Sequence, residues 1–352
     1  MRSRSTSSGT RERASITSRC LRSTIRSSTD VLRLMALVVP LLALVVIASA
    51  DGGERLATTA ATNGTMHGDA SSSAWSESLL LFLWCAASLA IIFGTRGWRP
   101  GSLDGPAWRP TIAVGLAAAV LIVLAGVLGE IGGSFLWPAA LGGGTAIARS
   151  IGAAVLQVGA CAVIVANRHS IFQRSHGHPS SAWWSVFGGA MGLLLAWPLV
   201  QLSMLVGAWI TAIVTDAPPP ELAHETLRQL RESEDLVLRV SKIALAVVAA
   251  PFVEEVLYRG VIQQMLRATG MGRSAAIMLV AALFAVMHLG DGAVSAASAG
   301  AALPALFLLG VLFGVLFERT GRLAAPVTAH ALFNAANVAF LLWRPSPTLP
   351  AP

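Results

Sequence analysis

The sequence predicts an all-α membrane protein, a polytopic bundle of transmembrane helices, and three observations support this fold class. Of its 352 residues, 55% are hydrophobic and only 12% are charged, roughly half the charged share of soluble domains. The mean hydropathy is +0.68. Apolar runs of about 20 residues, enough to cross a hydrocarbon core as helix, recur along the chain. They are continuous and do not alternate at every second residue, which favours helices over a membrane barrel.

Nine apolar segments are long enough to be spans. They cover residues 31–50, 78–94, 111–129, 150–166, 183–214, 238–265, 274–290, 301–317 and 325–343. The fifth contains Pro198, so we expect it either to be kinked or to combine a span with an interfacial piece. Eight spans are the alternative if one weak segment is re-entrant.

The positive charge is concentrated in residues 1–30. This tail holds seven arginines against Glu12 and Asp30, a net +5 of the total +7. A basic tail, with no basic domain behind it, predicts no nucleic-acid partner. Because the tail is rich in Ser and Thr with few apolar residues, we expect it to be disordered and cytosolic. A start at Met35 and a segment that touches anionic lipid heads are the alternatives.

The arginines of the loops predict the orientation, because cytosolic loops carry the excess of basic residues. With the N-terminus in the cytoplasm and nine spans, nine arginines fall in cytosolic loops, whereas the opposite loops are acidic or mixed. These are Arg96, Arg99, Arg109, Arg168, Arg174, Arg267, Arg273, Arg319 and Arg322. The chain is therefore expected to be a multi-pass protein of a bacterial inner membrane.

The sixth segment carries two adjacent acids and an arginine. Ionisable groups cost roughly 2.5–3.5 kcal/mol at the centre of a span, so Glu254, Glu255 and Arg259 need a reason to be there. Glu255 and Arg259 are four residues apart with the acid first, the favourable order for a helical ion pair. Glu254 is then left without a partner, which suits a general base. A structural salt bridge is the plainer explanation of the pair.

Two later segments carry imidazoles. His288 follows Phe284 by one turn in the seventh segment, and His330 precedes Asn334 by one turn in the ninth. Asn337 extends this polar stripe. A single His in an apolar helix is more often a hydrogen-bonded packing residue, and His330 with Asn334 could serve as interhelical hydrogen-bonding residues. Together with the two glutamates, however, they form an acid, imidazole and amide set, expected to converge on one pocket.

The order Glu-Glu-x-x-x-Arg, Phe-x-x-x-His and His-x-x-x-Asn resembles the CAAX-protease and bacteriocin-processing (Abi) family of intramembrane endopeptidases, which includes the Ras-converting enzyme. The resemblance covers about residues 240–340. It implies that Glu254 activates water and that His288 orients the water or shares a metal. Glu255 and Arg259 would be a supporting pair, and His330 and Asn334 would stabilise the oxyanion. All six residues are expected in the catalytic site: Glu254, Glu255, Arg259, His288, His330 and Asn334.

The resemblance leaves the need for a metal open, and no cofactor is required by the sequence. Zinc is the candidate, and Glu254, His288 and His330 would be its ligands. No His-Glu-x-x-His motif is present, because His224-Glu225 lacks the second His, and we favour a metal-independent reaction. Cys20, Cys85 and Cys161 are scattered and form neither a disulfide framework nor a zinc site. No Gly-x-Ser-x-Gly nucleophile is present either.

The predicted function is hydrolysis of a peptide bond in a membrane-associated protein or peptide, with membrane lipids as the other partner. The alternatives are a non-catalytic scaffold or immunity-type protein of the same fold, and a proton-coupled transporter, which would spread ionisable groups through both halves. The expected organisation is a tail (1–30), N-terminal transmembrane helices (31–214), an extracytoplasmic loop (215–236), a CAAX-protease-like core (237–345) and a short tail (346–352).

Overall fold

The computed structural model of the chain describes residues 70–94, 110–136, 144–167, 182–215, 236–290 and 299–343. These residues form helices joined by short turns, and none of them is in a strand. The predicted span 31–50, both terminal tails and the loop 215–236 apart from its end residues lie outside the described residues. The domain boundaries stay a prediction.

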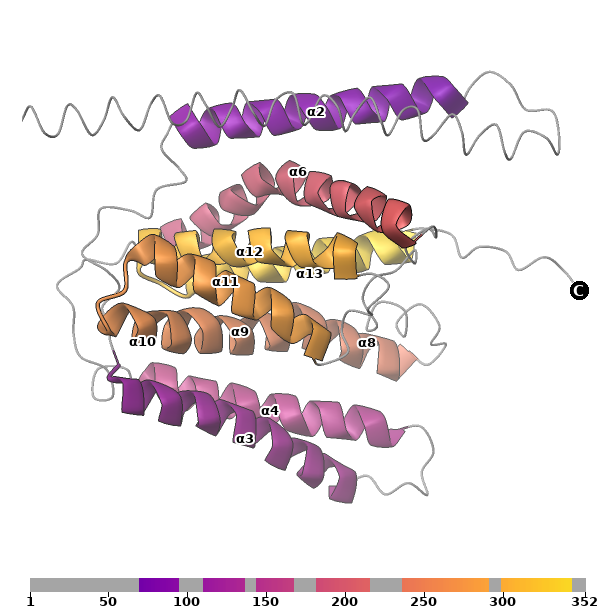
Figure 1. The fold of residues 1–352 in the computed structure, drawn as a ribbon. Helices are drawn as coiled ribbons and strands as arrows, with labels where there is room; N and C mark the ends of the chain where they lie inside the picture. Colours follow the sequence, from indigo (N-terminus) through magenta and orange to yellow (C-terminus); the bar gives the residue numbers. More distant parts are fainter. Residues whose placement is uncertain are drawn as a thin grey trace, which may run out of the picture. The chain divides into compact units, whose positions relative to one another are not determined.

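The described helices confirm the all-α polytopic fold (Figure 1). Each of the eight predicted segments from 78–94 onwards falls on a helix. Six of the described helices are long and apolar enough to cross a membrane, and Leu79–Gly94 and Arg273–Leu289 are shorter apolar helices. The helices are α2 (Ala70–Gly94), α3 (Ile112–Leu136), α4 (Gly144–Ala166), α6 (Ala182–Thr215), α8 (Leu236–Ala244), η2 (Leu245–Ala249), α9 (Ala250–Glu255), η3 (Val256–Ile262), α10 (Gln263–Ala268), α11 (Arg273–Gly290), α12 (Ala299–Thr320) and α13 (Ala324–Trp343).

The chain divides into two compact units, residues 1–93 and 94–352. In the first unit, α2 exposes the apolar side chains of Leu79, Leu80 and Leu83. A row of exposed leucines would be unfavourable in water and is suited to contact with lipid. The remaining helices belong to the second unit, which contains the predicted site.

Helices α3 and α4 pack side by side through small residues. A methyl group on Gly129 would collide with the carbonyl of Gly152, and one on Gly133 would collide with the carbonyl of Ala148. Glycines at such positions let two backbones approach closely, as in other membrane helix pairs. The ion pair between Glu130 and Arg149 joins the two helices at 3.6 Å.

The fifth predicted segment is one continuous helix, α6, which runs through Pro198 and bends in its middle (Figure 1). A proline inside a helix removes a backbone hydrogen bond and produces such bends. Helix α6 packs against α12 and α13. A methyl group on Gly189 would collide with the carbonyl of Ala325, and one on Gly192 would press on Leu316. Nothing lies within 4 Å of the Cβ position of Gly188.

The sixth predicted segment is a continuous helix from Leu236 to Ala268 with two π-helical stretches, η2 and η3. Pro251 explains the first of them. The N–H of Ala250 donates to the carbonyl of Leu245, five residues back, and Pro251 has no N–H to donate. The carbonyl of Ala246 is therefore left without either of its possible helical donors. The two π-helical stretches flank the Glu254–Glu255 pair, and such stretches are frequent at functional sites.

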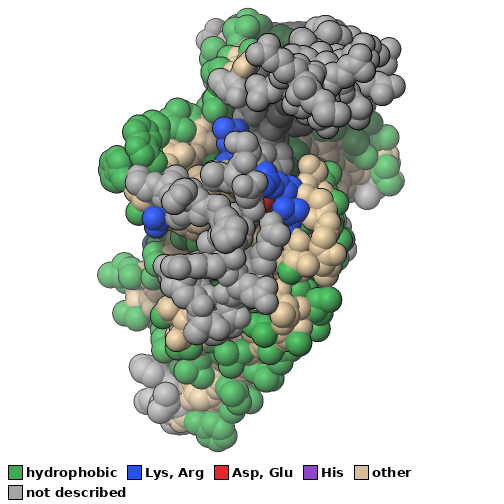
Figure 2. Space-filling view, turned by 90° about the vertical axis from the view of Figure 1, so that its left-hand side faces the viewer, with side chains coloured by type: hydrophobic (Ala, Val, Ile, Leu, Met, Phe, Trp, Pro, Cys, Tyr) green, Lys and Arg blue, Asp and Glu red, His purple; other side chains and the backbone are tan. Residues whose placement is uncertain are grey.

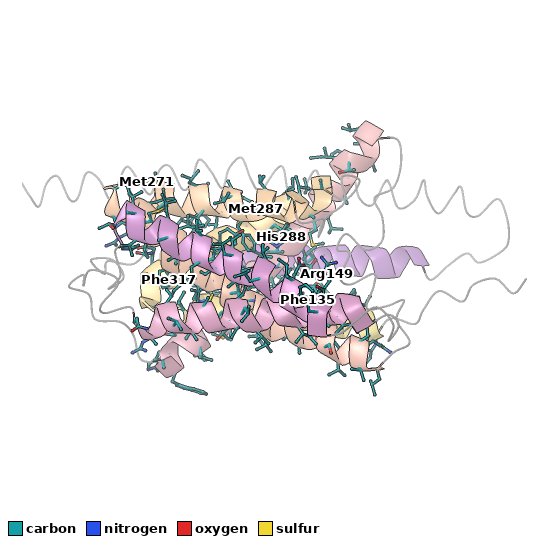
Figure 3. The ribbon with its side chains drawn as sticks, turned by 90° about the horizontal axis from the view of Figure 1, so that it is seen from below. Phe135, Arg149, Met271, Met287, His288 and Phe317 are labelled. Carbon is teal, nitrogen blue, oxygen red and sulfur yellow. The ribbon has the colours of Figure 1, made fainter. Side chains whose placement is uncertain are left out.

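Helices α11, α12 and α13 complete the core. Val280, Phe284, Leu309 and Phe313 are buried in one cluster that also receives residues from α6 and α13. Helix α11 carries His288 at the end opposite to Met271 (Figure 3). At the other end of the bundle, arginine side chains gather where α10 turns into α11 and α12 into α13 (Figure 2), and these turns carry Arg267, Arg273, Arg319 and Arg322.

Candidate active site

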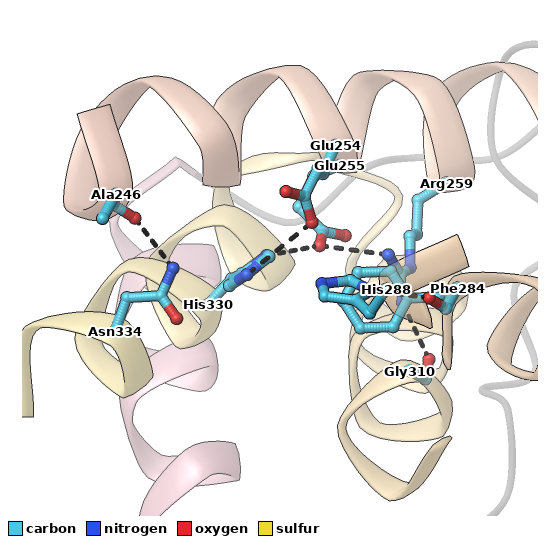
Figure 4. A network of polar contacts seen from close by, with 9 residues as sticks. All are labelled: Ala246, Glu254, Glu255, Arg259, Phe284, His288, Gly310, His330 and Asn334. Atoms are coloured by element: carbon cyan, nitrogen blue, oxygen red, sulfur yellow. Dashed lines mark hydrogen bonds and ion pairs between the residues drawn. The ribbon is translucent and has the colours of Figure 1, made fainter. Parts of the chain in front are cut away.

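The centre of the predicted site is the buried carboxylate of Glu255. Arg259 donates from Nη1 to its Oε1 over 3.1 Å, as the i,i+4 spacing predicted. The Nδ1 atom of His330, on α13, lies 2.9 Å from the same oxygen. Glu255 and Arg259 are fully buried and His330 nearly so. A charge-assisted contact of this kind is much stronger away from water than at a surface, so the cluster joins α9, η3 and α13 firmly (Figure 4).

The side chain of Arg259 contacts residues of α9, α11 and α12. Its Nη2 donates to the carbonyl of Gly310 on α12 over 3.1 Å. Its guanidinium carbon lies 4.8 Å from the ring centre of Phe284 and 5.2 Å from that of Phe313. Aromatic faces attract a cation, more strongly when it is removed from water. The guanidinium is therefore held behind Glu255 through Nη1 and Nη2, while its Nε makes no hydrogen bond within the described part of the chain.

Glu254 occupies a different environment from its neighbour. Its Oε2 lies 4.0 Å from Nε2 of His330, and this oxygen makes no hydrogen bond within the described part of the chain. About 27% of its side chain is exposed, whereas that of Glu255 is not exposed at all. The prediction that Glu254 lacks a partner therefore needs adjustment, because its Oε2 atom is buried and lies within ion-pair range of His330, although part of the side chain is exposed.

His288 lies on the other side of the cluster (Figure 4). Its Nδ1 is 2.7 Å from the backbone carbonyl of Phe284. Because a carbonyl oxygen only accepts, Nδ1 must carry a hydrogen, and Nε2 of the neutral ring is then an acceptor. The ring packs 4.6 Å from that of Phe284, whose edge also meets His330 at 5.9 Å.

Asn334 contacts the backbone of the sixth predicted segment. Its Nδ2 donates to the carbonyl of Ala246 over 2.8 Å, which is the carbonyl that Pro251 leaves without a helical donor. The amide thus stabilises the π-helical stretch η2, a role that the sequence did not predict. Asn337 does not extend the polar stripe to the glutamates, since its Nδ2 donates to the carbonyl of Phe333 within α13.

Several residues of the site were missed from the sequence. Gln263 and Glu318 are fully buried and hydrogen-bonded to each other over 3.0 Å, and Phe313 stacks on His330 at 4.8 Å. A signal for Gln263 was present, because it continues the four-residue spacing of Glu255 and Arg259. Glu318 likewise continues a four-residue spacing on α12, after Gly310 and Gly314.

The expected zinc ligands form no complete metal site. Within the described ranges, no group of three or more His, Cys, Asp or Glu residues is arranged to hold a metal ion. His330 uses Nδ1 on Glu255 and His288 uses Nδ1 on a carbonyl, which leaves the Nε2 atom of each ring available as a donor atom for a metal. The need for zinc therefore stays a prediction.

The fold and the site together define a polytopic α-helical membrane protein with an acid–imidazole cluster buried between its helices. Residues 237–336 match the family model of the Rce1-like type II CAAX prenyl endopeptidases. This segment is therefore similar to the CAAX-protease family, as the motifs indicated, and it contains all six predicted site residues. Compared with curated proteins and with solved structures, the chain shows no significant match.

Proposed function

We propose that the chain is an intramembrane endopeptidase of the CAAX-protease type, which hydrolyses a peptide bond of a membrane-associated protein or peptide. The observation that carries the proposal is the contrast between two adjacent glutamates. The side chain of Glu255 is fully buried and its Oε1 atom is bonded to both Arg259 and His330, whereas the side chain of Glu254 is partly exposed and its Oε2 atom faces an imidazole at 4.0 Å.

In the proposed reaction, Glu254 is the general base. Its carboxylate takes a proton from a water molecule, and the resulting hydroxide attacks the carbonyl carbon of the peptide bond. His288 can accept a hydrogen bond from that water at Nε2, because its Nδ1 hydrogen is held by Phe284. Glu254 then returns the proton to the nitrogen of the leaving amine as the C–N bond breaks. A positioned base of this kind contributes about 10²- to 10⁴-fold in rate.

His330 is proposed to stabilise the oxyanion. The carboxylate of Glu255 accepts from Nδ1–H, so Nε2 can donate only when the ring is the imidazolium. The carboxylate of Glu255 orients the ring, as the acid of a Ser-His-Asp triad orients its histidine. A preorganised donor in such a site is worth about 2.7–4 kcal/mol in the transition state. Asn334 uses one of its two amide hydrogens on Ala246, and the other is proposed to face the substrate.

The substrate is proposed to reach the site from the bilayer, as a peptide segment of a membrane-associated protein. The chain is proposed to lie in a bacterial inner membrane with its N-terminus in the cytoplasm, because Arg267, Arg273, Arg319 and Arg322 are all predicted for cytosolic loops. The proposed reaction is independent of metal, since water activation is assigned to Glu254.

The test compares wild-type protein with Glu254→Gln, a variant of the same shape that cannot accept the proton. Both are placed in bacterial membranes, and the peptides released are identified by mass spectrometry. A farnesylated peptide ending in Cys-aliphatic-aliphatic-X is tested separately in vesicles. We expect peptides that appear only with the wild-type chain.

Glu130→Gln serves as the matched control, because this acid lies on α3 and is half exposed. It should release the same peptides as wild type. Identical peptide sets from wild type and Glu254→Gln would contradict the proposal and favour a scaffold or a transporter.

A further inference from the structure

Two rows of residues face each other along α9–α10 and α12. On the first helix they are Glu255, Arg259, Gln263 and Arg267, and on α12 they are Gly310, Gly314 and Glu318, at intervals of four residues in both rows. We call this set the polar seam. The seam begins at the candidate active site and ends at the turn between α10 and α11.

The contacts of the polar seam follow one another in order. Arg259 donates to the carbonyl of Gly310 over 3.1 Å. Gln263 donates from Nε2 to the carbonyl of Gly314 over 3.5 Å and to Oε1 of Glu318 over 3.0 Å. Arg267 then approaches the same Glu318 oxygen at 3.8 Å. Arg259 and Gln263 therefore contact successive residues of the second row, and Gln263 and Arg267 share Glu318.

The π-helical stretch η3 keeps the first row on one face. In an α-helix, four residues turn through about 400°, so a row at this spacing drifts by roughly 40° at each step. In η3 the N–H of Gln263 donates to the carbonyl of Tyr258, five residues back. This wider winding reduces the drift, and Arg259 and Gln263 both reach α12.

The glycines of α12 make the second row accessible. A methyl group on Gly310 would lie 2.9 Å from the Cα of Ala281. One on Gly314 would lie 3.0 Å from Ile277 and 3.1 Å from the Oε1 of Gln263. The absent side chains therefore allow α11 to pack closely and leave two backbone carbonyls open to Arg259 and Gln263.

Glu318 closes the seam with a fully buried charge. Its Oε2 lies 3.7 Å from Nε of Arg273, and its other oxygen contacts Gln263 and Arg267. Buried ion pairs add little to stability compared with well-packed apolar residues, and their best-attested use is to specify how helices align. The contact of Gln263 with Glu318 defines one axial position of α10 against α12, because a shift by a single residue would break it.

We propose that Gln263 and Glu318 are positioning residues for hydrolysis: they fix the axial register of the helix that carries Glu254 and Glu255 against α12. Neither side chain touches the reacting atoms. The effect reaches the site through Arg259, one step along the seam, which holds both Glu255 and Gly310. This inference rests on the proposed endopeptidase function.

The test exchanges the amide of Gln263 and the carboxylate of Glu318. Gln263→Glu places two acids side by side, Glu318→Gln removes the acid, and the double variant restores one acid and one amide in the reverse order. The kcat and KM for cleavage of the farnesylated peptide in vesicles are measured for all four proteins, with the unfolding midpoint in detergent. Because small misplacements near a reacting group cost up to about 10²-fold in rate, we expect each single variant to lose on the order of 10- to 100-fold in kcat at unchanged KM. The double variant should recover most of the lost kcat.

Gln157→Glu is the matched control, since Gln157 on α4 also packs against a glycine of a neighbouring helix, Gly126, but lies outside the seam. It should keep the wild-type kcat even if its unfolding midpoint falls. Should Gln263→Glu fail to fold, Gly314→Ala is the milder probe, because its methyl group presses on the Gln263 amide.

Two results would overturn the positioning role while leaving the endopeptidase intact. One is a folded single variant with wild-type kcat, and the other is a double variant no better than the single ones. A wild-type chain that cleaves neither this peptide nor any membrane protein in a Glu254-dependent way would instead contradict the proposed function, and the positioning role with it.

Discussion

Helices α3 and α4 and the segment from α8 to α13 use glycine in different ways. Between α3 and α4, Gly129 and Gly133 bring backbone against backbone, and the ion pair of this region has side chains that are 53% and 50% exposed. In the second region, Gly310 and Gly314 also allow close packing, but their carbonyls accept hydrogen bonds from buried Arg259 and Gln263. The same small residues thus serve simple packing in one region and a buried polar network in the other.

The difference shows where charge is tolerated within an apolar bundle. Glu130 and Arg149 keep contact with the surroundings, so they avoid most of the cost of burial. Glu255, Arg259 and Glu318 are fully buried, which is unfavourable unless every charge has a partner. The buried, paired charges therefore distinguish the second region, which contains the candidate active site.

Glu254→Gln should lower turnover by about 10²- to 10⁴-fold, because the amide cannot act as a base. The unfolding free energy should change by less than about 1 kcal/mol, since the Oε2 of Glu254 makes no hydrogen bond that the amide would lose. Initial rates in vesicles and unfolding in detergent measure the two effects. A turnover within a few-fold of wild type would remove Glu254 from its assigned role.

Arg259→Met should destabilise the fold by about 3–5 kcal/mol, because it leaves the Glu255 carboxylate buried without its cation. The double variant with Glu255→Leu should recover part of this loss, since it removes the isolated charge. Unfolding titrations of the two single variants and the double variant measure the coupling. Additive losses would mean that the pair makes no specific contact.

Gly310→Ala should destabilise the fold by about 1–3 kcal/mol, because the added methyl group would press on Ala281 in a packed interface. Gly132→Ala on α3 is the control, since nothing lies within 4 Å of its Cβ position. It should be neutral or stabilising, as alanine favours a helix over glycine by roughly 0.5–1 kcal/mol. Equal losses at both positions would show that the α11–α12 contact is not tight.

Glu130→Gln should change the unfolding free energy by less than about 1 kcal/mol, because exposed ion pairs contribute little. Cleavage should be unaffected. The measurement is unfolding at low and high salt, which should differ little between variant and wild type. A loss of cleavage would show that α3 and α4 take part in the reaction. The site would then not be confined to the segment from α8 to α13.

The sequence was enough to predict the fold class, the helical segments within the described residues and the ion pair between Glu255 and Arg259. These features depend on local properties, namely the length of an apolar run and the four-residue spacing along one helix face. The three motifs on separate segments also pointed to the family, because acids and imidazoles are rare within spans.

The hydrogen bonds between different helices became visible in the tertiary structure alone. Asn334 bonds to Ala246 because Pro251 and the π-helical stretch leave that carbonyl without a donor. Gln263 meets Glu318 because the glycines of α12 admit it. Which carbonyl is left open depends on the hydrogen-bond register of one helix, and which side chain reaches it depends on how a second helix packs there. Neither is encoded in the spacing of residues along a single helix.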